Sequence, residues 1–366
     1  MARNDWAIVI GIKDYIDPDL AGLEGPENDA RAFHEWVVNG DGGDVPKGQA
    51  ALLVSSDFGP PFASASAAMP TQEAIKAAFD HLLSIADSNA DKGLGREIGD
   101  RLYLFFSGHG FAPDHHDELV ALLTANASVA GAQLSHVIGS YMADTFWRAG
   151  LFKEILLFMD CCRNVMDCAQ LYQPYVDERA TDFDQVRRFY AYGARVAKEA
   201  REWKMDDGKY HGVFTATLLD ALTASGYDRD DPSVITADSL NNQLYNGFKS
   251  FLSPADRDRP GKPWEPTVVY ERNPASPFTI VRRKRGIGRF FGQAPVKMCN
   301  VTILPSPARI GKKATIIDQK MAKVSDTVLQ ASTTLSLQLG FYGLLVEGEQ
   351  LPVTFEVVGD GKRVNA

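Results

Sequence analysis

Two short polar segments in this sequence contain the residue types that thiol-based catalysis needs. Ser107-Gly108-His109-Gly110 follows the apolar run LYLFF, and Asp160-Cys161-Cys162-Arg163-Asn164 follows the apolar run ILLFM. A cysteine acts as a nucleophile as its thiolate, and a neighbouring histidine is the usual base that removes the thiol proton. The two segments therefore predict a nucleophilic pair formed by His109 and one of the two cysteines.

The apolar runs before these segments have the length of buried strands. Strands are expected at 6–12, 50–54, 102–106, 155–159 and 189–194, and helices at 27–38, 71–86, 134–148, 213–223 and 236–252. This alternation predicts an α/β fold, a mostly parallel sheet flanked by helices. Ligands bind at the carboxyl edge of such a sheet, and His109 and the cysteines follow two of its strands.

Glycines beside His109 suit the same chemistry. Gly108 and Gly110 allow a tight turn, and the Gly110 N–H, together with the Cys162 N–H, would form an oxyanion hole. The structural alternative is a core histidine in a glycine turn with two inert buried thiols. Because both polar segments stand at strand ends, the sequence favours a site.

The bulk composition narrows the class of protein. The chain has 366 residues, a formal net charge of −9 and 45% hydrophobic residues, values typical of a globular protein. The negative charge argues against nucleic-acid binding. Four cysteines, two of them adjacent, predict a reducing cytoplasmic setting. No signal-peptide pattern or bilayer-length apolar run is present, so membrane contact is not expected.

The pattern changes near residue 278, after a proline-rich stretch. Helical periodicity gives way to short alternating segments such as VKMCNVTIL and PVTFEVVG. We therefore expect two domains, 1–273 and 274–366, the second being a small β-sandwich.

Together, these motifs resemble the caspase-like cysteine peptidase superfamily. FFSGHG precedes DCCRN so that 53 residues separate His109 from Cys162, and animal caspases have a spacing of about 50. The segments 23–30 and 208–215 extend the resemblance, which covers residues 5 to about 252. The Asp-Cys-Cys element is most similar to metacaspases and their bacterial relatives, which implies Cys162 as nucleophile, Cys161 as a structural neighbour and His109 as base. Arg163-Asn164 departs from the His-Ser-Gly of metacaspases, and arginine at this position is similar to animal caspases.

The resemblance also implies a substrate preference. Metacaspase relatives accept Arg or Lys before the scissile bond (P1) in an acidic S1 pocket, and the matching positions here are Asp29 and Asp160. A helix N-cap is the structural alternative for Asp29. Arg31 and Arg163 keep open a basic pocket for P1 aspartate, as in animal caspases.

No cofactor or metal is expected, because the sequence has no HExxH and no paired CxxC motif. Some metacaspases are activated by calcium, and the segment 228–231 would supply carboxylates if it is not simply a solvated turn. The polar stretch 164–188 is either a self-processing site or a solvated loop. The basic run 282–285 is read as a solvated linker, with contact to an anionic membrane as the alternative.

The sequence thus predicts a cysteine endopeptidase that cuts protein substrates after Arg or Lys in a regulated death, stress or defence pathway. The β domain is expected to bind a regulatory partner. The rival hypotheses are a catalytically silent caspase-like scaffold, whose buried thiol would resist an electrophilic probe, and a peptidase that cuts after Asp.

Overall fold

The structure is a computed structural model of the chain and divides into two compact units, Met1–Gly292 and Gln293–Ala366. It describes residues 4–366 with gaps at 21, 114–118, 130–133, 167–179, 181–182, 196–199, 229–230, 232, 253–264, 274, 283–298, 319–322, 338–339, 350 and 358–360. The division falls later than the expected boundary at residue 273. The reason is that strand β14 (Thr279–Arg282) pairs with β12 (Val234–Thr236) of the first unit.

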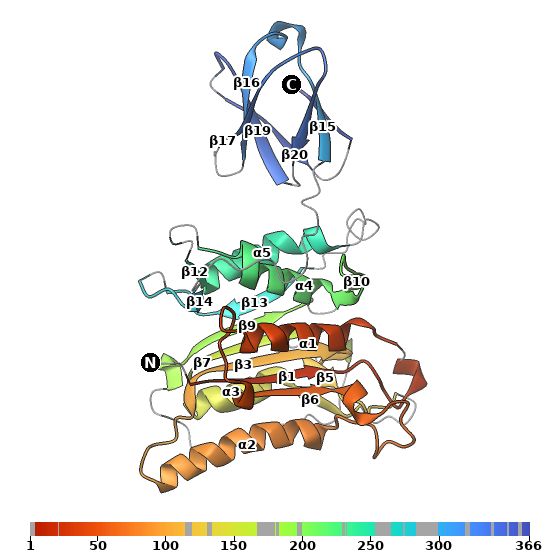
Figure 1. Cartoon of the computed structure of the whole chain (residues 1–366), viewed down its shortest axis with the longest axis vertical. Helices are drawn as coiled ribbons and strands as arrows, with labels where there is room; N and C mark the ends of the chain where they lie inside the picture. The colour runs from red at the N-terminus through yellow and green to blue at the C-terminus, as the bar shows by residue number, and fades with distance from the viewer. Residues whose placement is uncertain are drawn as a thin grey trace. The chain divides into compact units, whose positions relative to one another are not determined.

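A mostly parallel sheet forms the centre of the first unit (Figure 1). Within the described residues its strand order is β13-β9-β7-β3-β1-β2. The strands are β1 (Asp5–Gly11), β2 (Ala50–Val54), β3 (Gly99–Gly108), β7 (Phe152–Cys161), β9 (Arg187–Tyr192) and β13 (Thr267–Tyr270). Neighbouring strands are parallel except β13 and β9, which are antiparallel. The predicted parallel sheet is confirmed, and the carboxyl ends of β1, β3 and β7 meet at one edge.

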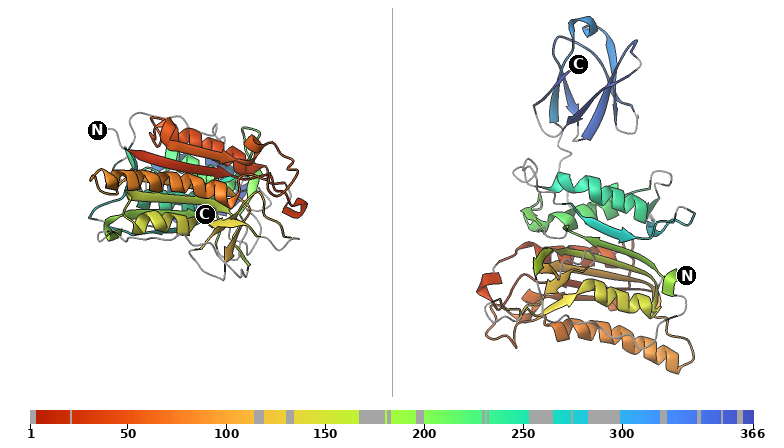
Figure 2. Two further views of the ribbon diagram at one scale, coloured as in Figure 1. Left: turned by 90° about the horizontal axis from the view of Figure 1, so that it is seen from below. Right: turned by 180° about the vertical axis from the view of Figure 1, so that it is seen from behind.

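Helices cover both faces of this sheet (Figure 1 and Figure 2). They are α1 (Gly25–Val38), α2 (Gln72–Asp91), α3 (Gly139–Arg148), α4 (Val213–Asp220) and α5 (Ala237–Gly247). Strand residues alternate between the faces: Ile8 and Ile10 pack with α2 and α3, whereas Ala7 and Val9 pack with α1, α4 and α5. Burial on both faces explains why the strands are continuous apolar runs in the sequence.

Capping residues fix where two of the helices begin. The Thr71 hydroxyl accepts the Ala74 N–H at 3.2 Å at the start of α2. A reciprocal capping box between Thr236 and Ser239 starts α5. The helix expected over 236–252 ends at Gly247 and continues as a 3-10 turn, Phe248–Phe251.

The prediction of a helix over 134–148 is wrong in its first part. Residues His136–Ile138 form strand β6, and α3 begins at Gly139. β6 is buried and pairs with the equally buried β5 (Ala121–Leu123), so tertiary packing overrides the local helical pattern.

A smaller sheet continues from the carboxyl edge of the large one. In the part of the chain that is described, its strand order is β6-β5-β4-β8, with β4 (Gly110–Pro113) following β3 and β8 (Asn164–Met166) following β7. A hairpin of β10 (Glu202–Lys204) and β11 (Tyr210–Gly212) lies against α1. Short helical turns occur at Pro18–Leu20, Lys47–Gln49, Ser55–Phe58, Phe183–Gln185, Ala221–Ser225 and Pro307–Arg309.

The second unit consists of strands around a core of its own. These are β15 (Cys299–Leu304), β16 (Lys313–Asp318), β17 (Lys323–Val328), β18 (Thr333–Leu337), β19 (Gly340–Val346), β20 (Val353–Val357) and β21 (Lys362–Asn365). They form two sheets, β18-β15-β21 and β17-β16-β19-β20. Val301 and Leu337 of the first sheet pack with Ile316 and Leu344 of the second in one apolar cluster. A small β domain was predicted, and it is confirmed.

Candidate active site

The two polar segments leave neighbouring strands at the same level. In the β3–β7 ladder the last residues of the two strands, Gly108 and Cys161, lie opposite each other. His109 and Cys162 are the residues that directly follow them. Beyond them β4 and β8 run parallel, with Phe111 opposite Asn164. The offset between paired positions is 53 residues in both ladders, since 161 − 108 = 53 and 164 − 111 = 53. The two segments therefore lie side by side at the carboxyl edge.

Tyr15, in the loop after β1, holds the His109 segment. The His109 N–H donates to the Tyr15 hydroxyl at 2.9 Å, and the two ring centroids are 5.1 Å apart. The same hydroxyl donates to the Ile12 carbonyl at 3.2 Å. Burial raises the pKa of Tyr15 well above its ordinary value, so the phenol stays neutral and keeps the proton that it donates.

The adjacent cysteines have different surroundings. Cys161 is buried, with its Sγ 3.8 Å from the Phe106 carbonyl oxygen, and burial raises the pKa of its thiol well above the ordinary value. Cys162 is half-buried beyond the end of β7, with its Sγ 4.0 Å from the carbonyl oxygen of Ala200. A thiol with a raised pKa is a poor nucleophile, which leaves Cys162 as the better candidate.

The backbone at Gly110 lies directly against the cysteine segment. A Cβ atom on this glycine would stand 2.6 Å from the Cys161 Cβ and 3.0 Å from the Cys162 carbonyl oxygen. The Leu123 N–H donates to the His109 carbonyl at 2.8 Å, which makes Gly110 and Leu122 a non-hydrogen-bonded pair of the β4–β5 ladder. The Gly110 N–H therefore points away from β5.

Asp29 is buried inside α1, which begins at Gly25, so the alternative of a helix N-cap is wrong. Its carboxylate accepts the Gly212 N–H at 3.0 Å and the Ser107 hydroxyl at 3.3 Å. It also lies 2.9 Å from Nδ1 of His211. Burial raises the pKa of Asp29, and the His211 contact opposes that rise.

Asp160 lies beneath the nucleophile segment as a second buried carboxylate. Its Oδ2 accepts the Thr215 hydroxyl at 2.7 Å and the Thr215 N–H at 3.0 Å. Burial, and then the negative charge of Asp29, raise the pKa of Asp160 to about 7. Gly212 must be a glycine, because a Cβ there would stand 1.9 Å from the Asp160 Oδ2. The structure thus brings Asp29 and Asp160 together.

His211 joins Asp29 to a third carboxylate. Its Nδ1 lies 2.9 Å from Asp29 and its Nε2 lies 3.0 Å from Asp207. An ionised carboxylate only accepts hydrogen bonds, so contacts with two ionised carboxylates favour the doubly protonated imidazolium. Burial alone would lower the pKa of His211, but the contacts with Asp29 and Asp207 raise it. These contacts therefore favour the positively charged form of His211 beside the acidic pair.

The two arginines considered for a basic pocket are engaged elsewhere. Arg163 is fully buried, packs 4.9 Å over the Tyr192 ring and donates to the Ala194 carbonyl at 3.0 Å. Arg31 pairs with Asp57 at 2.8 Å on the surface. These contacts give no support to a pocket for P1 aspartate.

Asp160 should make the stability of the first unit depend on pH. Its folded pKa lies above the ordinary 3.8, so its stabilising effect is complete below 3.8 and is lost as pH rises through about 7. Between pH 5 and pH 8 we expect the free energy of unfolding of the wild type to fall by about 2 kcal/mol more than that of Asp160→Asn. Urea unfolding at the two pH values measures this difference. Asp57→Asn, at an exposed acid, is the control, and equal losses in wild type and Asp160→Asn would contradict the assignment.

Three residues of the site were given no role by the sequence analysis. Tyr15 lies in a loop, and His211 and Thr215 reach the acidic pair only through contacts between distant parts of the chain. The segment 208–215 contributed to the family resemblance, but no role could be assigned to its residues from spacing alone.

Three further predictions fall partly outside the described residues. Arg229 and Asp230 of the calcium segment lie outside them, whereas Asp228 accepts the Thr236 hydroxyl at 2.9 Å. Most of the polar stretch 164–188 and of the basic run 282–285 is also outside.

Among the described residues, no group of three His, Cys, Asp or Glu side chains could hold a metal ion. Within the same residues, no helix is both long and apolar enough to cross a bilayer.

The fold and its edge segments are those of a caspase-like cysteine peptidase. The chain belongs to the Peptidase C14 family, because residues 4–251, more than half of its length, match the Caspase domain. A relative named as a probable protease, from a Desulfuromonadales bacterium, is 28% identical over 248 residues. That match covers 61% of this chain and 26% of the relative, so the chain spans about a quarter of the relative's length.

Two solved structures are also similar to this chain. Caspase-1 from Spodoptera frugiperda matches with a TM-score of 0.42 at 11% identity, over 73% of this chain and 86% of the caspase. The structure of pro-sf-caspase-1 matches with a TM-score of 0.40, also at 11% identity, over 73% and 91% of the two chains. The family resemblance drawn from the sequence motifs is confirmed by the family match.

Proposed function

We propose that the protein is a cysteine endopeptidase in which Cys162 is the nucleophile and His109 the base. The observation that carries this proposal is that the two residues lie side by side: each directly follows a residue of the pair Gly108–Cys161 in the β3–β7 ladder. The half-buried position of Cys162 and the buried, high-pKa thiol of Cys161 support the choice of cysteine. The family to which the chain belongs supports the reaction class.

The reaction follows from the chemistry of this pair. His109 takes the proton of the Cys162 thiol, and the sulfur forms a bond to the scissile carbonyl carbon. The C–N bond then breaks as His109 returns the proton to the leaving amine. A water molecule, deprotonated by His109, attacks the thioester and releases the acid product, and the thiol is restored. The N–H groups of Gly110 and Cys162 donate to the developing oxyanion, in keeping with the closeness of Gly110 to the cysteine segment.

We further propose that Asp29 and Asp160 select Arg or Lys at P1. Their burial side by side supports this, because a buried carboxylate pair attracts a cation strongly. Asp29 already contacts His211, so the substrate cation pairs chiefly with Asp160. Since the pKa of Asp160 is about 7, the KM for a P1 Arg peptide falls as pH rises through 7.

Fluorogenic peptides that differ only at P1 test this function. Wild type should prefer Arg over the neutral Gln by at least about 30-fold in kcat/KM, and Asp160→Asn should remove most of that preference. Turnover after Asp would retain the peptidase and overturn the acidic pocket. If no peptide is cleaved and Cys162 stays unlabelled by an electrophilic thiol probe, the chain is a latent enzyme or a silent scaffold.

The family resemblance supports a role in which one partner is cut in a regulated death, stress or defence response, and the cysteine usage supports a cytoplasmic location. The second unit, which has its own core, is proposed to recruit a partner or to restrain the protease. Calcium activation is the alternative to the expected absence of a cofactor, and adding the ion to the peptide assay, with chelator as control, tests it.

A further inference from the structure

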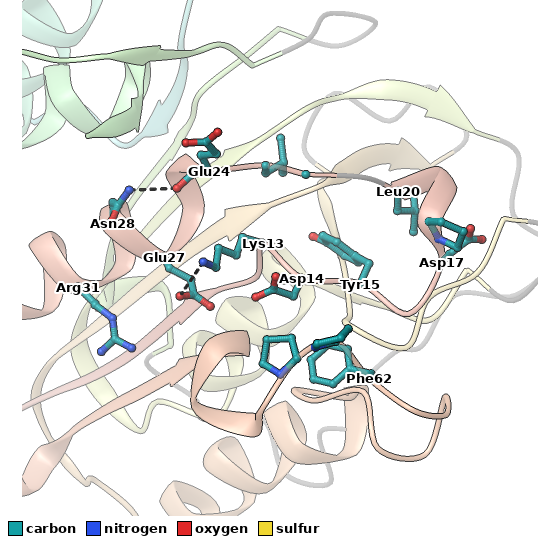
Figure 3. Close-up of a pocket in the computed structure, with 15 residues that line it drawn as sticks. Lys13, Asp14, Tyr15, Asp17, Leu20, Glu24, Glu27, Asn28, Arg31 and Phe62 are labelled. Atoms are coloured by element: carbon teal, nitrogen blue, oxygen red, sulfur yellow. Dashed lines mark hydrogen bonds and ion pairs between the residues drawn. The ribbon is translucent and has the colours of Figure 1, made fainter. Parts of the chain in front are cut away.

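A large pocket opens beside the candidate active site and has no part in the mechanism described so far. It has a volume of about 770 Å³ and lies where the chain leaves β1. We call it the β1 pocket, and it is lined by Asp14, Tyr15, Glu24, Glu27, Phe62 and neighbouring residues (Figure 3). Its volume is within the range of about 300–1,000 Å³ that is usual for ligand-binding pockets.

Tyr15 connects the β1 pocket to His109. One part of this side chain lines the pocket, and its hydroxyl and ring contact the His109 N–H and imidazole. A ligand that touches Tyr15 in the pocket would therefore be separated from the candidate base, His109, by this side chain.

The sheet order determines which part of a substrate can reach the pocket. Cys162 follows β7, His109 follows the adjacent β3, and the pocket follows β1 on the far side of β3. His109 thus lies between the nucleophile and the β1 pocket. Because the histidine must give its proton to the leaving amine, the chain on the carboxyl side of the scissile bond extends from the nucleophile past His109.

We propose that the β1 pocket binds the leaving side of the substrate, at P2′ and P3′, and selects basic residues there. The inference rests on the proposed endopeptidase function and adds a second point of substrate selection to it. The pocket is lined by more acids than bases, namely Asp14, Asp17, Glu24 and Glu27 against Lys13 and Arg31.

The bases of the pocket are already paired, and two acids are positioned to meet a ligand. Lys13 lies 3.9 Å from Glu27, and Arg31 pairs with Asp57. Asp14 is half-buried and accepts the Ser55 hydroxyl at 3.1 Å through Oδ2, while Glu24 is exposed at the rim. Asp14 and Glu24 are therefore the carboxylates that a guanidinium or ammonium group would meet.

The apolar part of the pocket suits the same kind of ligand. Pro60, Pro61 and Phe62 form an apolar wall of the pocket, and Phe62 is labelled in Figure 3. The methylene chain of an Arg or Lys side chain can lie along such a wall while its charged end reaches the carboxylates. A leaving segment that is acidic would instead be repelled.

Internally quenched peptides with a common P4–P1′ sequence and Arg, Ala or Glu at P2′ and P3′ test the proposal. In wild type we expect kcat/KM for the Arg peptide to exceed that for the Glu peptide by at least about 10-fold. The double variant Asp14→Asn, Glu24→Gln should reduce this ratio to about twofold. The control variant Glu35→Gln neutralises an exposed acid of helix α1, which follows Glu24, outside the pocket, and it should leave the ratio unchanged.

A ratio near one in wild type, or an unchanged ratio in the double variant, would overturn the β1 pocket as the selecting site. Should no peptide be cleaved, binding of the leaving-side peptides Ser-Arg-Arg and Ser-Glu-Glu to the wild-type chain, measured by calorimetry, decides the matter. If the wild type binds the Arg peptide and the double variant binds it more weakly, the β1 pocket is retained as a binding site and the peptidase function is rejected. Equal or absent binding of both peptides would reject the pocket as well.

Discussion

Cys162→Ala should lower kcat/KM by at least about 10³-fold, whereas Cys161→Ala should leave it within about threefold of wild type. In the proposed mechanism the sulfur of Cys162 forms the covalent intermediate, so its removal eliminates the reaction path. Cys161 is buried and its raised thiol pKa keeps it protonated, so it contributes packing and no thiolate.

Peptide turnover, measured beside alkylation by iodoacetamide, checks this pair of variants. Alkylation of the 161–162 segment, followed by mass spectrometry, should persist in Cys161→Ala and disappear in Cys162→Ala. Equal loss of turnover in both variants, with equal loss of secondary structure, would show that the effect is on folding. Full activity in Cys162→Ala would refute the mechanism.

Arg101→Met should destabilise the first unit by about 3–5 kcal/mol. The Arg101 side chain is 2% exposed, and its guanidinium donates to Glu154 at 2.7 Å and to the Tyr103 hydroxyl at 2.9 Å. It also donates to the Thr279 carbonyl at 2.7 Å, which ties β14 to the sheet. Its removal leaves the largely buried Glu154 with one fewer positive partner.

Urea unfolding followed by tryptophan fluorescence measures this loss in the first unit alone, because all five tryptophans lie within residues 1–292. Arg96→Met is the matched control. Arg96 pairs with Asp87 at 3.0 Å on the surface, and its loss should cost less than about 1 kcal/mol. Arg101→Met, Glu154→Leu should recover part of the loss, because no charge is then left unpaired. Similar costs for the two single variants would contradict the buried network.

The ends of the strands were harder to predict than their centres. The apolar runs at 102–106 and 155–159 mark the middle of β3 and β7, which extend three residues further at the amino end and two at the carboxyl end. Arg101 and Glu154 are the charged residues directly before the two apolar runs. They lie inside because their charges pair with each other in the core.

The acidic pair was predictable only in part. The family resemblance identified Asp29 and Asp160, but the residues that contact them and influence their charge are distant in the sequence. His211 is 182 residues from Asp29, and Thr215 is 55 residues from Asp160. Similarly, the domain boundary was placed too early because the pairing of β14 with β12 is not apparent in either segment alone.

The constant offset between the β3–β4 and β7–β8 segments has a consequence for the evolution of relatives. One inserted residue within either paired segment would turn every following side chain to the opposite face, and His109 would no longer emerge level with Cys162. Insertions between residues 113 and 152 would leave the pairing intact. Natural length variation should therefore collect in that connection and avoid the paired segments, and an alignment of active relatives with gaps inside them would be misaligned.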